Sequence, residues 1–331
     1  LKKYYKRIGI QLLLTYLLGT TDVHFENLIA HGEYPVLIDL ECLFPVTYLN
    51  DTQSISGEIY NRLANSVLAT GILPVYHWNK HGKGINSGAI NLSSGQECPF
   101  KMPVVVFPVT SDMRIEYRAP KIKSTNNAAT IKGKFMPPCL YKKEIEIGFQ
   151  MAYNAVLKRK AEFGKYLKKI SGNISRVVLE DTQKYSMLLS ASYHPSLLMD
   201  GVERELFLYS VWKGNEKKPA DIVHNEVKSL LSGDIPYFYR KANEKNIYGN
   251  NNLSITDYFH VSVSEILAER IKKISIEDLQ WQTQLIEISL EFSSINKVKC
   301  INKLYRVDQY KQPQTSDIYN VDTLITKLFE Q

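Results

Sequence analysis

The chain has 331 residues, of which 44% are hydrophobic, and a net charge of +7 at neutral pH. This length and apolar content predict a globular protein with one large domain or two ordinary ones. No segment approaches the roughly 18 consecutive apolar residues of a membrane span. Residues 1–19 mix charge into an amphipathic pattern without a cleavage site, so we predict a cytoplasmic protein.

The four cysteines, Cys42, Cys98, Cys139 and Cys300, are far apart, with no C-x-x-C pair and no histidine at zinc-site spacing. They predict neither a disulfide framework nor a structural zinc. Lysines gather in two segments, 118–134 and 157–169. We interpret these as solvated surface, or alternatively as attraction for an anionic ligand such as a nucleotide or an acidic peptide. No signature of nucleic-acid binding is present.

Apolar residues at helical spacing predict a helix over 3–18, and Gly19 follows where a C-terminal cap belongs. After the loop 20–27, two short apolar runs flank HGEYP and predict a β-hairpin. We expect Asp39 where its second strand ends and Glu41 on the same strand face.

Residues 45–140 are the least regular and predict a loop system or lid that contains short helical or strand-like pieces. Within them, the glycine-containing segment 81–88 lacks a phosphate-binding spacing and predicts a flexible loop.

From residue 141 onward the pattern is helical. It predicts one long helix over 142–170, or two helices broken at Gly164, and a tail or linker over 296–331. The fold class is therefore α+β and mainly helical. Further helices are expected near 181–192, 220–232, 257–273 and 276–293.

The spacing of polar residues in 21–44 matches the needs of phosphoryl transfer. A protein-kinase catalytic loop has an Asp that orients the acceptor hydroxyl, an Asn five residues later that binds magnesium, and then a second metal-binding Asp. Asp22 and Asn27 are five residues apart, and Asp39 follows the predicted hairpin.

Each residue type suits a role in that chemistry. Magnesium takes oxygen ligands, so Asn27 and Asp39 are candidate metal ligands, and Glu41 can support a second metal or hold a first ligand. Asp22 can accept the proton of an attacking hydroxyl, and His24 can donate to a phosphate oxygen or brace the loop. The alternative is structural. Asp22 would then cap a turn, Asn27 would start a strand and His24 would fill a polar gap. Asp39 would be a loop residue.

The segment TDVHFENLIAHGEYPVLIDLECLF, residues 21–44, resembles the signature of the dehydratase domain of class II (LanM-type) lanthipeptide synthetases. The resemblance spans most of 1–295 in the family's order. It continues through TSDMRIE, EIGFQMAY, SRVVLEDTQKY, ERELF, GDIPYF and LQWQTQLIEISL.

This resemblance implies lanthipeptide (lantibiotic) biosynthesis on a fold similar to lipid kinases and protein kinases. ATP and Mg²⁺ phosphorylate Ser and Thr of a ribosomal leader–core precursor peptide, and the same site then eliminates phosphate, with ADP present, to leave dehydroalanine or dehydrobutyrine. The family's phosphorylation residues fall on Asp22, His24, Asn27, Asp39 and Glu41. Its elimination residues fall on Arg176 and Thr182.

The elimination pair suits its chemistry as well. The Arg176 guanidinium can bind phosphate oxygens through two donors. Thr182 can donate to the phosphate, or alternatively it caps the helix that begins there. Relatives often carry Arg in place of Glu180 and Thr in place of Cys42. A negative charge at Glu180 is expected to slow elimination or alter substrate binding.

Only 21 residues precede Asp22, so we expect 1–295 to be the C-terminal-lobe portion of a dehydratase whose N-lobe is absent. Within it, 1–44 forms the catalytic and metal loop, 45–140 an activation-type loop region and 141–295 a helical region. Residues 296–331 lead toward a missing cyclase domain. The missing N-lobe and cyclase are expected partners. The alternatives are an inactive remnant that binds the precursor peptide, or a metal-dependent phosphohydrolase.

Overall fold

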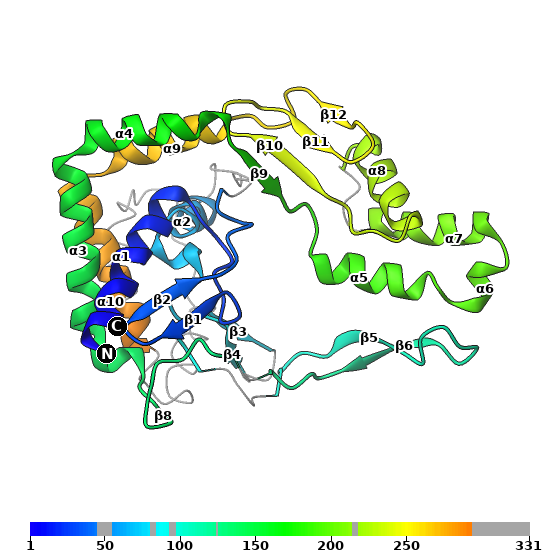
Figure 1. Ribbon diagram of the computed structural model, residues 1–331, viewed down its shortest axis with the longest axis horizontal. Helices are drawn as coiled ribbons and strands as arrows, with labels where there is room; N and C mark the ends of the chain where they lie inside the picture. The colour runs from blue at the N-terminus through cyan, green and yellow to red at the C-terminus, as the bar shows by residue number, and fades with distance from the viewer. Residues whose placement is uncertain (45–54, 80–83, 93–96, 124, 214–217, 293–331) are drawn as a thin grey trace, which may run out of the picture.

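The computed structural model describes residues 1–44, 55–79, 84–92, 97–123, 125–213 and 218–292, arranged as in Figure 1. The three longest helices pack together on the left of this view, and short antiparallel sheets lie beside and beyond them. The predicted α+β class is therefore confirmed, while the kinase-like lobe stays a prediction. In these ranges, none of the helices is both long enough and apolar enough to pass through a membrane.

The predicted first helix is confirmed as α1 (Lys2–Leu18). It ends at Gly19, whose φ of 71° lies in the left-handed region that glycine enters without strain. The Gly19 N–H donates to the carbonyl of Tyr16 at 3.1 Å. This cap ends α1 and begins the loop that contains Asp22.

α1 crosses α3 (Lys142–Lys158) where each helix has a glycine. A Cβ on Gly9 would lie 2.0 Å from the carbonyl oxygen of Ile145, and a Cβ on Gly148 would lie 1.9 Å from that of Lys6. Both distances are far below van der Waals contact, so only glycine allows the two backbones to approach this closely.

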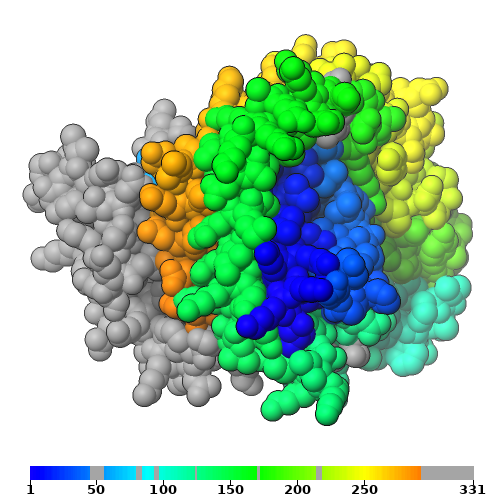
Figure 2. Space-filling model, turned by 60° about the vertical axis from the view of Figure 1, so that its left-hand side comes forward, coloured from blue at the N-terminus to red at the C-terminus, as the bar shows by residue number. Residues whose placement is uncertain are grey.

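A third helix, α10 (Ile276–Phe292), joins this pair through Asp278. The Asp278 carboxylate accepts hydrogen bonds from the hydroxyls of Tyr153 at 2.6 Å and Tyr16 at 3.0 Å, and from the Gln282 amide at 3.0 Å. Figure 2 shows α3, in green, lying between α1, in blue, and α10, in orange. One carboxylate thus connects three helices that are distant in sequence.

The predicted hairpin is confirmed as β1 (Leu28–His31) and β2 (Tyr34–Leu37), with Leu28 opposite Leu37. The second strand ends earlier than predicted, so Asp39 lies two residues beyond it and Glu41 lies in a turn. The expectation of a shared strand face is therefore wrong. The Asp39 Oδ1 accepts the Glu41 N–H at 3.0 Å, a local turn that competes with strand pairing.

The short pieces predicted between 45 and 140 are present in its described part, mainly as hairpins. Gly84 lies against Trp78, since a Cβ there would be 2.2 Å from the indole, so the described part of 81–88 forms a strand instead of a flexible loop. The elements are α2 (Ile55–Ala64), η1 (Val67–Thr70), β3 (Tyr76–Trp78), β4 (Gly84–Asn86), β5 (Met102–Val106), β6 (Arg114–Arg118), β7 (Thr130–Ile131), β8 (Lys134–Phe135) and η2 (Pro138–Tyr141).

The long helical pattern after residue 141 breaks at Arg159, not at Gly164. α4 (Lys160–Lys168) begins after it and includes Gly164 in its interior. Lys160 Nζ donates to the carbonyls of Lys272 and Ile274 at 2.9 and 3.0 Å, where α9 (Val263–Lys273) ends. Packing of α4 alongside α9 therefore sets the break (Figure 1).

A four-stranded antiparallel sheet, absent from the predicted helical region, follows α4 and η3 (Lys169–Gly172). Its strands have only two to four residues, too few to show a period of two. In spatial order they are β12 (Ser254–Ile255), β11 (Ile247–Gly249), β10 (Phe238–Lys241) and β9 (Ile174–Val177).

Helices pack against this sheet and beside it. The predicted helices near 181–192, 220–232 and 276–293 are confirmed, and the one predicted over 257–273 begins later, after the Ser262 N-cap. The predicted tail over 296–331 lies outside the described residues. The remaining helices are α5 (Thr182–Ala191), α6 (Pro195–Leu198), α7 (Gly201–Leu208), η4 (Tyr209–Trp212) and α8 (Ala220–Leu231).

We predict that Gly148→Ala lowers the free energy of unfolding by ~1–3 kcal/mol, because the new methyl group must push α1 away from α3. Gly164→Ala is the matched control, because outside its own helix its Cβ would meet, of the residues that the structure describes, only Ile271 Cδ1 at 3.9 Å. Removing a helix-interior glycine there is expected to raise the free energy of unfolding by ~0.5–1 kcal/mol. Urea unfolding followed by circular dichroism measures both, and equal effects would contradict the prediction.

Candidate functional site

The loop after α1 is held by backbone hydrogen bonds from three other segments. The Thr21 N–H donates to the carbonyl of Cys42 at 3.2 Å, and the Val23 N–H donates to that of Thr70 at 3.0 Å. The Phe25 N–H donates to a third, distant carbonyl, that of Ser87, at 3.2 Å. Val23 itself is buried. The loop is therefore a fixed part of the fold.

Asp22 sits at the turn of this loop with a φ of 61°, in the left-handed region that aspartate enters more readily than most residues. Its carbonyl accepts the His24 N–H at 2.9 Å and the Asn27 side-chain amide at 3.0 Å. Asn27 thus uses its Nδ2 to hold the turn, which leaves its Oδ1 available as an acceptor. His24 Nδ1 accepts the Glu26 N–H at 3.2 Å, which leaves Nε2 to donate.

Three aspartates from distant segments act on one another here. The pKa of the Asp22 carboxyl is raised, first by its removal from solvent and then by the negative charges of Asp181 and Asp39, while His24 opposes the shift. Asp181 comes from the turn before α5 and was not among the predicted site residues. The part of the site around Asp22 therefore has an excess of negative charge.

Asn27 and Asp39 are compatible with a hard cation. Among the described residues, no three His, Cys, Asp or Glu side chains converge as a metal cage. Mg²⁺ does not need such a cage, because one or two carboxylates suffice when phosphates and water supply the other ligands. The oxygen-only donors and the excess negative charge beside Asp22 match that requirement.

One ion pair joins the two predicted halves of the site. Arg176 on β9 donates through Nη1 to the Glu41 carboxylate, although 135 residues separate them in sequence. The same guanidinium lies 5.7 Å from the centre of the Tyr237 ring. The residues expected for phosphorylation and the arginine expected for elimination therefore share one site.

Thr182 is the first residue of α5, and the N-cap is Asp181, whose side chain accepts the Gln183 N–H at 2.8 Å. The capping alternative for Thr182 is therefore wrong, because the preceding aspartate fills that role. In the described part of the chain the Thr182 hydroxyl has no hydrogen-bond partner. At the start of α5, it is therefore available to a ligand.

Glu180 does not leave an uncompensated negative charge. It is paired with Lys184 at 3.0 Å and with the buried Lys218 at 2.9 Å. Burial raises the pKa of Glu180, but the two lysines lower it more, so the net shift is downward. The expected repulsion of phosphate at this position is thereby reduced.

Lys218 also donates to the fully buried Glu226 at 3.0 Å, and the Tyr185 hydroxyl donates to Glu226 at 2.5 Å. Burial raises the pKa of Glu226, and these two donors oppose that shift. Sequence reasoning missed Lys218 and Glu226. One signal was present: Glu226 lies within the apolar stripe of α8, where an acid requires a buried partner.

Comparison with known proteins gives two matches. A family model described as "Domain of unknown function (DUF4135)" matches residues 1–241. The Lacticin 481/lactococcin biosynthesis protein LcnDR2 of Lactococcus lactis subsp. lactis is 27% identical over 301 residues. That match covers 88% of this chain and 31% of the relative, so the chain spans about a third of that protein's length.

The pKa of the Cys42 thiol depends on the charges of the site. Burial and then Asp22, Glu41 and Asp39 raise its pKa to about 11. Only the thiolate is alkylated, so Cys42 is expected to react at pH 8 ~100-fold more slowly than an unperturbed cysteine. Asp22→Asn removes a nearby negative charge, lowers this pKa and speeds the reaction with iodoacetamide.

Peptide mass spectrometry follows alkylation at Cys42. Asp112→Asn is the matched control, because it removes the same charge at an exposed aspartate outside the site. If Asp22→Asn and Asp112→Asn both leave the alkylation rate of Cys42 unchanged, the charge of Asp22 does not raise the pKa of this thiol.

We predict that Lys218→Met lowers the free energy of unfolding by ~3–5 kcal/mol, because it leaves the Glu226 carboxylate buried without its cation. Lys184→Met removes a more exposed partner of Glu180 and is expected to cost at most ~1 kcal/mol. Adding Glu226→Gln to Lys218→Met should recover much of the loss. Urea unfolding tests this, and equal costs for the two lysines would contradict it.

Proposed function

We propose that this chain acts in lanthipeptide biosynthesis as part of a dehydratase. The chain belongs to the DUF4135 family and is a class II lanthipeptide synthetase-related domain. Its substrate is a ribosomal precursor peptide whose Ser and Thr residues are phosphorylated and then lose phosphate. The observation that carries this proposal is the Arg176–Glu41 ion pair, because it brings the residues for both steps into one site.

In the first step, the Ser or Thr hydroxyl oxygen attacks the γ-phosphorus of ATP, and the bond to ADP breaks. Asp22 accepts the hydroxyl proton, and the upward shift of its pKa makes the carboxylate a stronger base. His24 Nε2 donates to a phosphate oxygen. The helix, loop and hairpin of residues 2–37 support the comparison with a kinase C-terminal lobe.

Asn27 and Asp39 would hold Mg²⁺ through oxygen atoms, and Glu41 would support them. When bound, the ion supplies positive charge that stabilises the phosphate oxygens of ATP. Asn27 also fixes the Asp22 turn through its amide, so one side chain serves both the metal and the proton acceptor.

In the second step, a base removes the Cα proton, the Cα–Cβ double bond forms, and the Cβ–O bond breaks as inorganic phosphate leaves. Arg176 uses one nitrogen to reach Glu41, which leaves Nε and Nη2 to bind the departing phosphate. The Thr182 hydroxyl donates to the same group. The contact with Glu41 thereby holds Arg176 beside the residues proposed for phosphorylation.

The elimination step can be tested without ATP. A chemically phosphorylated precursor peptide is incubated with the chain, ADP and Mg²⁺, and intact mass spectrometry follows the loss of one phosphoric acid per site. Arg176→Ala is expected to slow this loss by ~100–1,000-fold, because it removes the donors that stabilise the leaving group. Arg176→Lys keeps the charge but not the paired geometry, so an intermediate rate is expected.

Arg159→Ala is the matched control, since Arg159 is exposed and has no ion pair in the described residues. It should eliminate phosphate at the parent rate. No loss of phosphate, even when the longer synthetase is used, would overturn the proposal and favour a chain that only binds the precursor peptide.

A further inference from the structure

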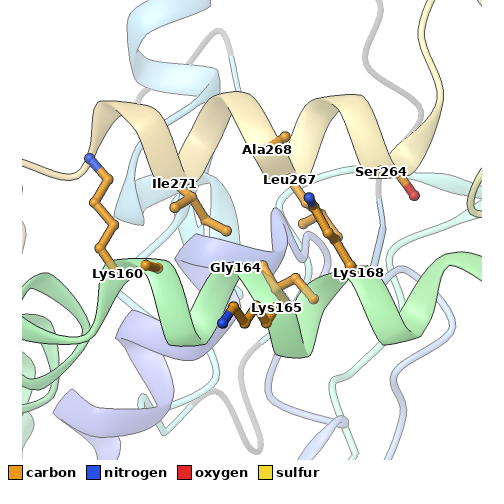
Figure 3. Close-up of a pocket in the computed structure, with 10 residues that line it drawn as sticks. Lys160, Gly164, Lys165, Lys168, Ser264, Leu267, Ala268 and Ile271 are labelled. Carbon is orange, nitrogen blue, oxygen red and sulfur yellow. The ribbon is translucent and has the colours of Figure 1, made fainter.

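A groove outside this site runs between α4 and α9, which lie side by side (Figures 1 and 3). Its volume is about 620 Å³, within the ~300–1,000 Å³ of typical ligand sites. The apolar part of its lining comes from both helices: Ala161, Gly164, Leu167, Leu267, Ala268 and Ile271.

The middle of the groove is open because α4 has a glycine there. Among the described residues, and apart from the backbone of α4 itself, a Cβ on Gly164 would meet only Ile271 Cδ1 within 4 Å, at 3.9 Å. The two helices therefore leave a gap at this point that their own side chains do not fill. Contact with water along this apolar strip is unfavourable, so an apolar partner is stabilised by filling it.

Lysines from α4 border the apolar strip. Figure 3 shows Lys160 and Lys168 reaching from α4 toward α9, and Lys165 lies on the same helix. Lys160 donates hydrogen bonds to the carbonyls at the end of α9. Lys165 and Lys168 are exposed and have no ion pair within the described ranges. The border therefore offers positive charge to carboxylates on a partner.

The groove is connected to the proposed site through the core. Leu267 belongs to the same buried cluster as Phe44, and Leu167 and Leu43 pack against that cluster. Leu43 and Phe44 lie two and three residues after Glu41 in the sequence. In the other direction along the chain, α4 leads through η3 to β9, where Arg176 lies. A peptide held in the groove would thus be anchored beside the elements that carry Glu41 and Arg176.

We propose that this groove docks an amphipathic helical segment of the precursor peptide, outside the residues that are modified, with carboxylates flanking its apolar face. A groove between two helices is suited to a third helix, whose apolar residues at i, i+3, i+4 and i+7 fill the strip. Lys165 and Lys168 select acidic flanks. That the partner is the precursor peptide rests on the proposed function.

The probe is a fluorescein-labelled helical peptide with leucines at that spacing and glutamates beside them. A second peptide has lysines in place of the glutamates, and a third has the first composition in shuffled order. Fluorescence anisotropy with the full chain is expected to show binding of the acidic amphipathic peptide, and binding at least about tenfold weaker for the other two. The unlabelled precursor peptide should displace the probe.

Two kinds of variant test the location. Gly164→Phe fills the gap, and the double variant Lys165→Glu and Lys168→Glu reverses the border charge; each should weaken binding by about tenfold or more. The matched control is the double variant Lys213→Glu and Lys228→Glu, which changes the net charge equally at exposed lysines away from the groove. It should retain parent affinity. Gly164→Ala, with room for its methyl group, checks that the helix tolerates substitution.

Absence of probe binding, equal affinity for the charge-reversed peptide, or unchanged affinity of the groove variants would overturn the proposal. Displacement of the probe by ATP but not by the precursor would assign the groove to a nucleotide instead. The outcome is separable from that of the proposed function, because Arg176→Ala should bind the probe normally while losing elimination. Groove variants should retain elimination from a short phosphopeptide that lacks the docking segment.

Discussion

The close crossing of α1 and α3 is the constraint on which the rest of the structure depends. Two glycines allow the helix backbones to touch, and Asp278 joins both helices to α10. α1 ends at the loop that contains Asp22, and α3 continues through α4 to the strand that contains Arg176. Because packed helices are stiff, fixing the crossing also fixes the relation between these two distant parts of the chain.

The charges of the site are divided between two regions. Asp22, Asp39 and Asp181 form a side with excess negative charge, which suits a metal ion and the acceptance of a proton. On the other side, Arg176 supplies a positive charge that Glu41 partly compensates. The buried Lys218 joins Glu180, which precedes α5, to Glu226 on α8. One fold therefore presents two regions of different charge, as the proposed two steps would require.

The groove between α4 and α9 has a structural origin in the same arrangement. The chain turns at Arg159, so α4 leaves the central helices and lies along α9. The leucines of this contact continue into the cluster around Phe44, next to the segment that contains Glu41. The proposed partner in the groove would consequently contact a cluster that also includes Leu43 and Phe44, and its docking could position a peptide without touching the reacting groups.

The sequence by itself determined the local features: α1 and its glycine cap, the β1–β2 hairpin and several later helices; it also supplied the residues that we propose for phosphoryl transfer. These follow from periodicity, turn residues and spacing, which act over a few positions. Tertiary structure alone decided the Arg176–Glu41 pair, the approach of Asp181, the Lys218–Glu226 network, the break at Arg159 and the four-stranded sheet. Each depends on contacts between segments far apart in the chain, and local spacing carries no information on which charges meet when the helices pack.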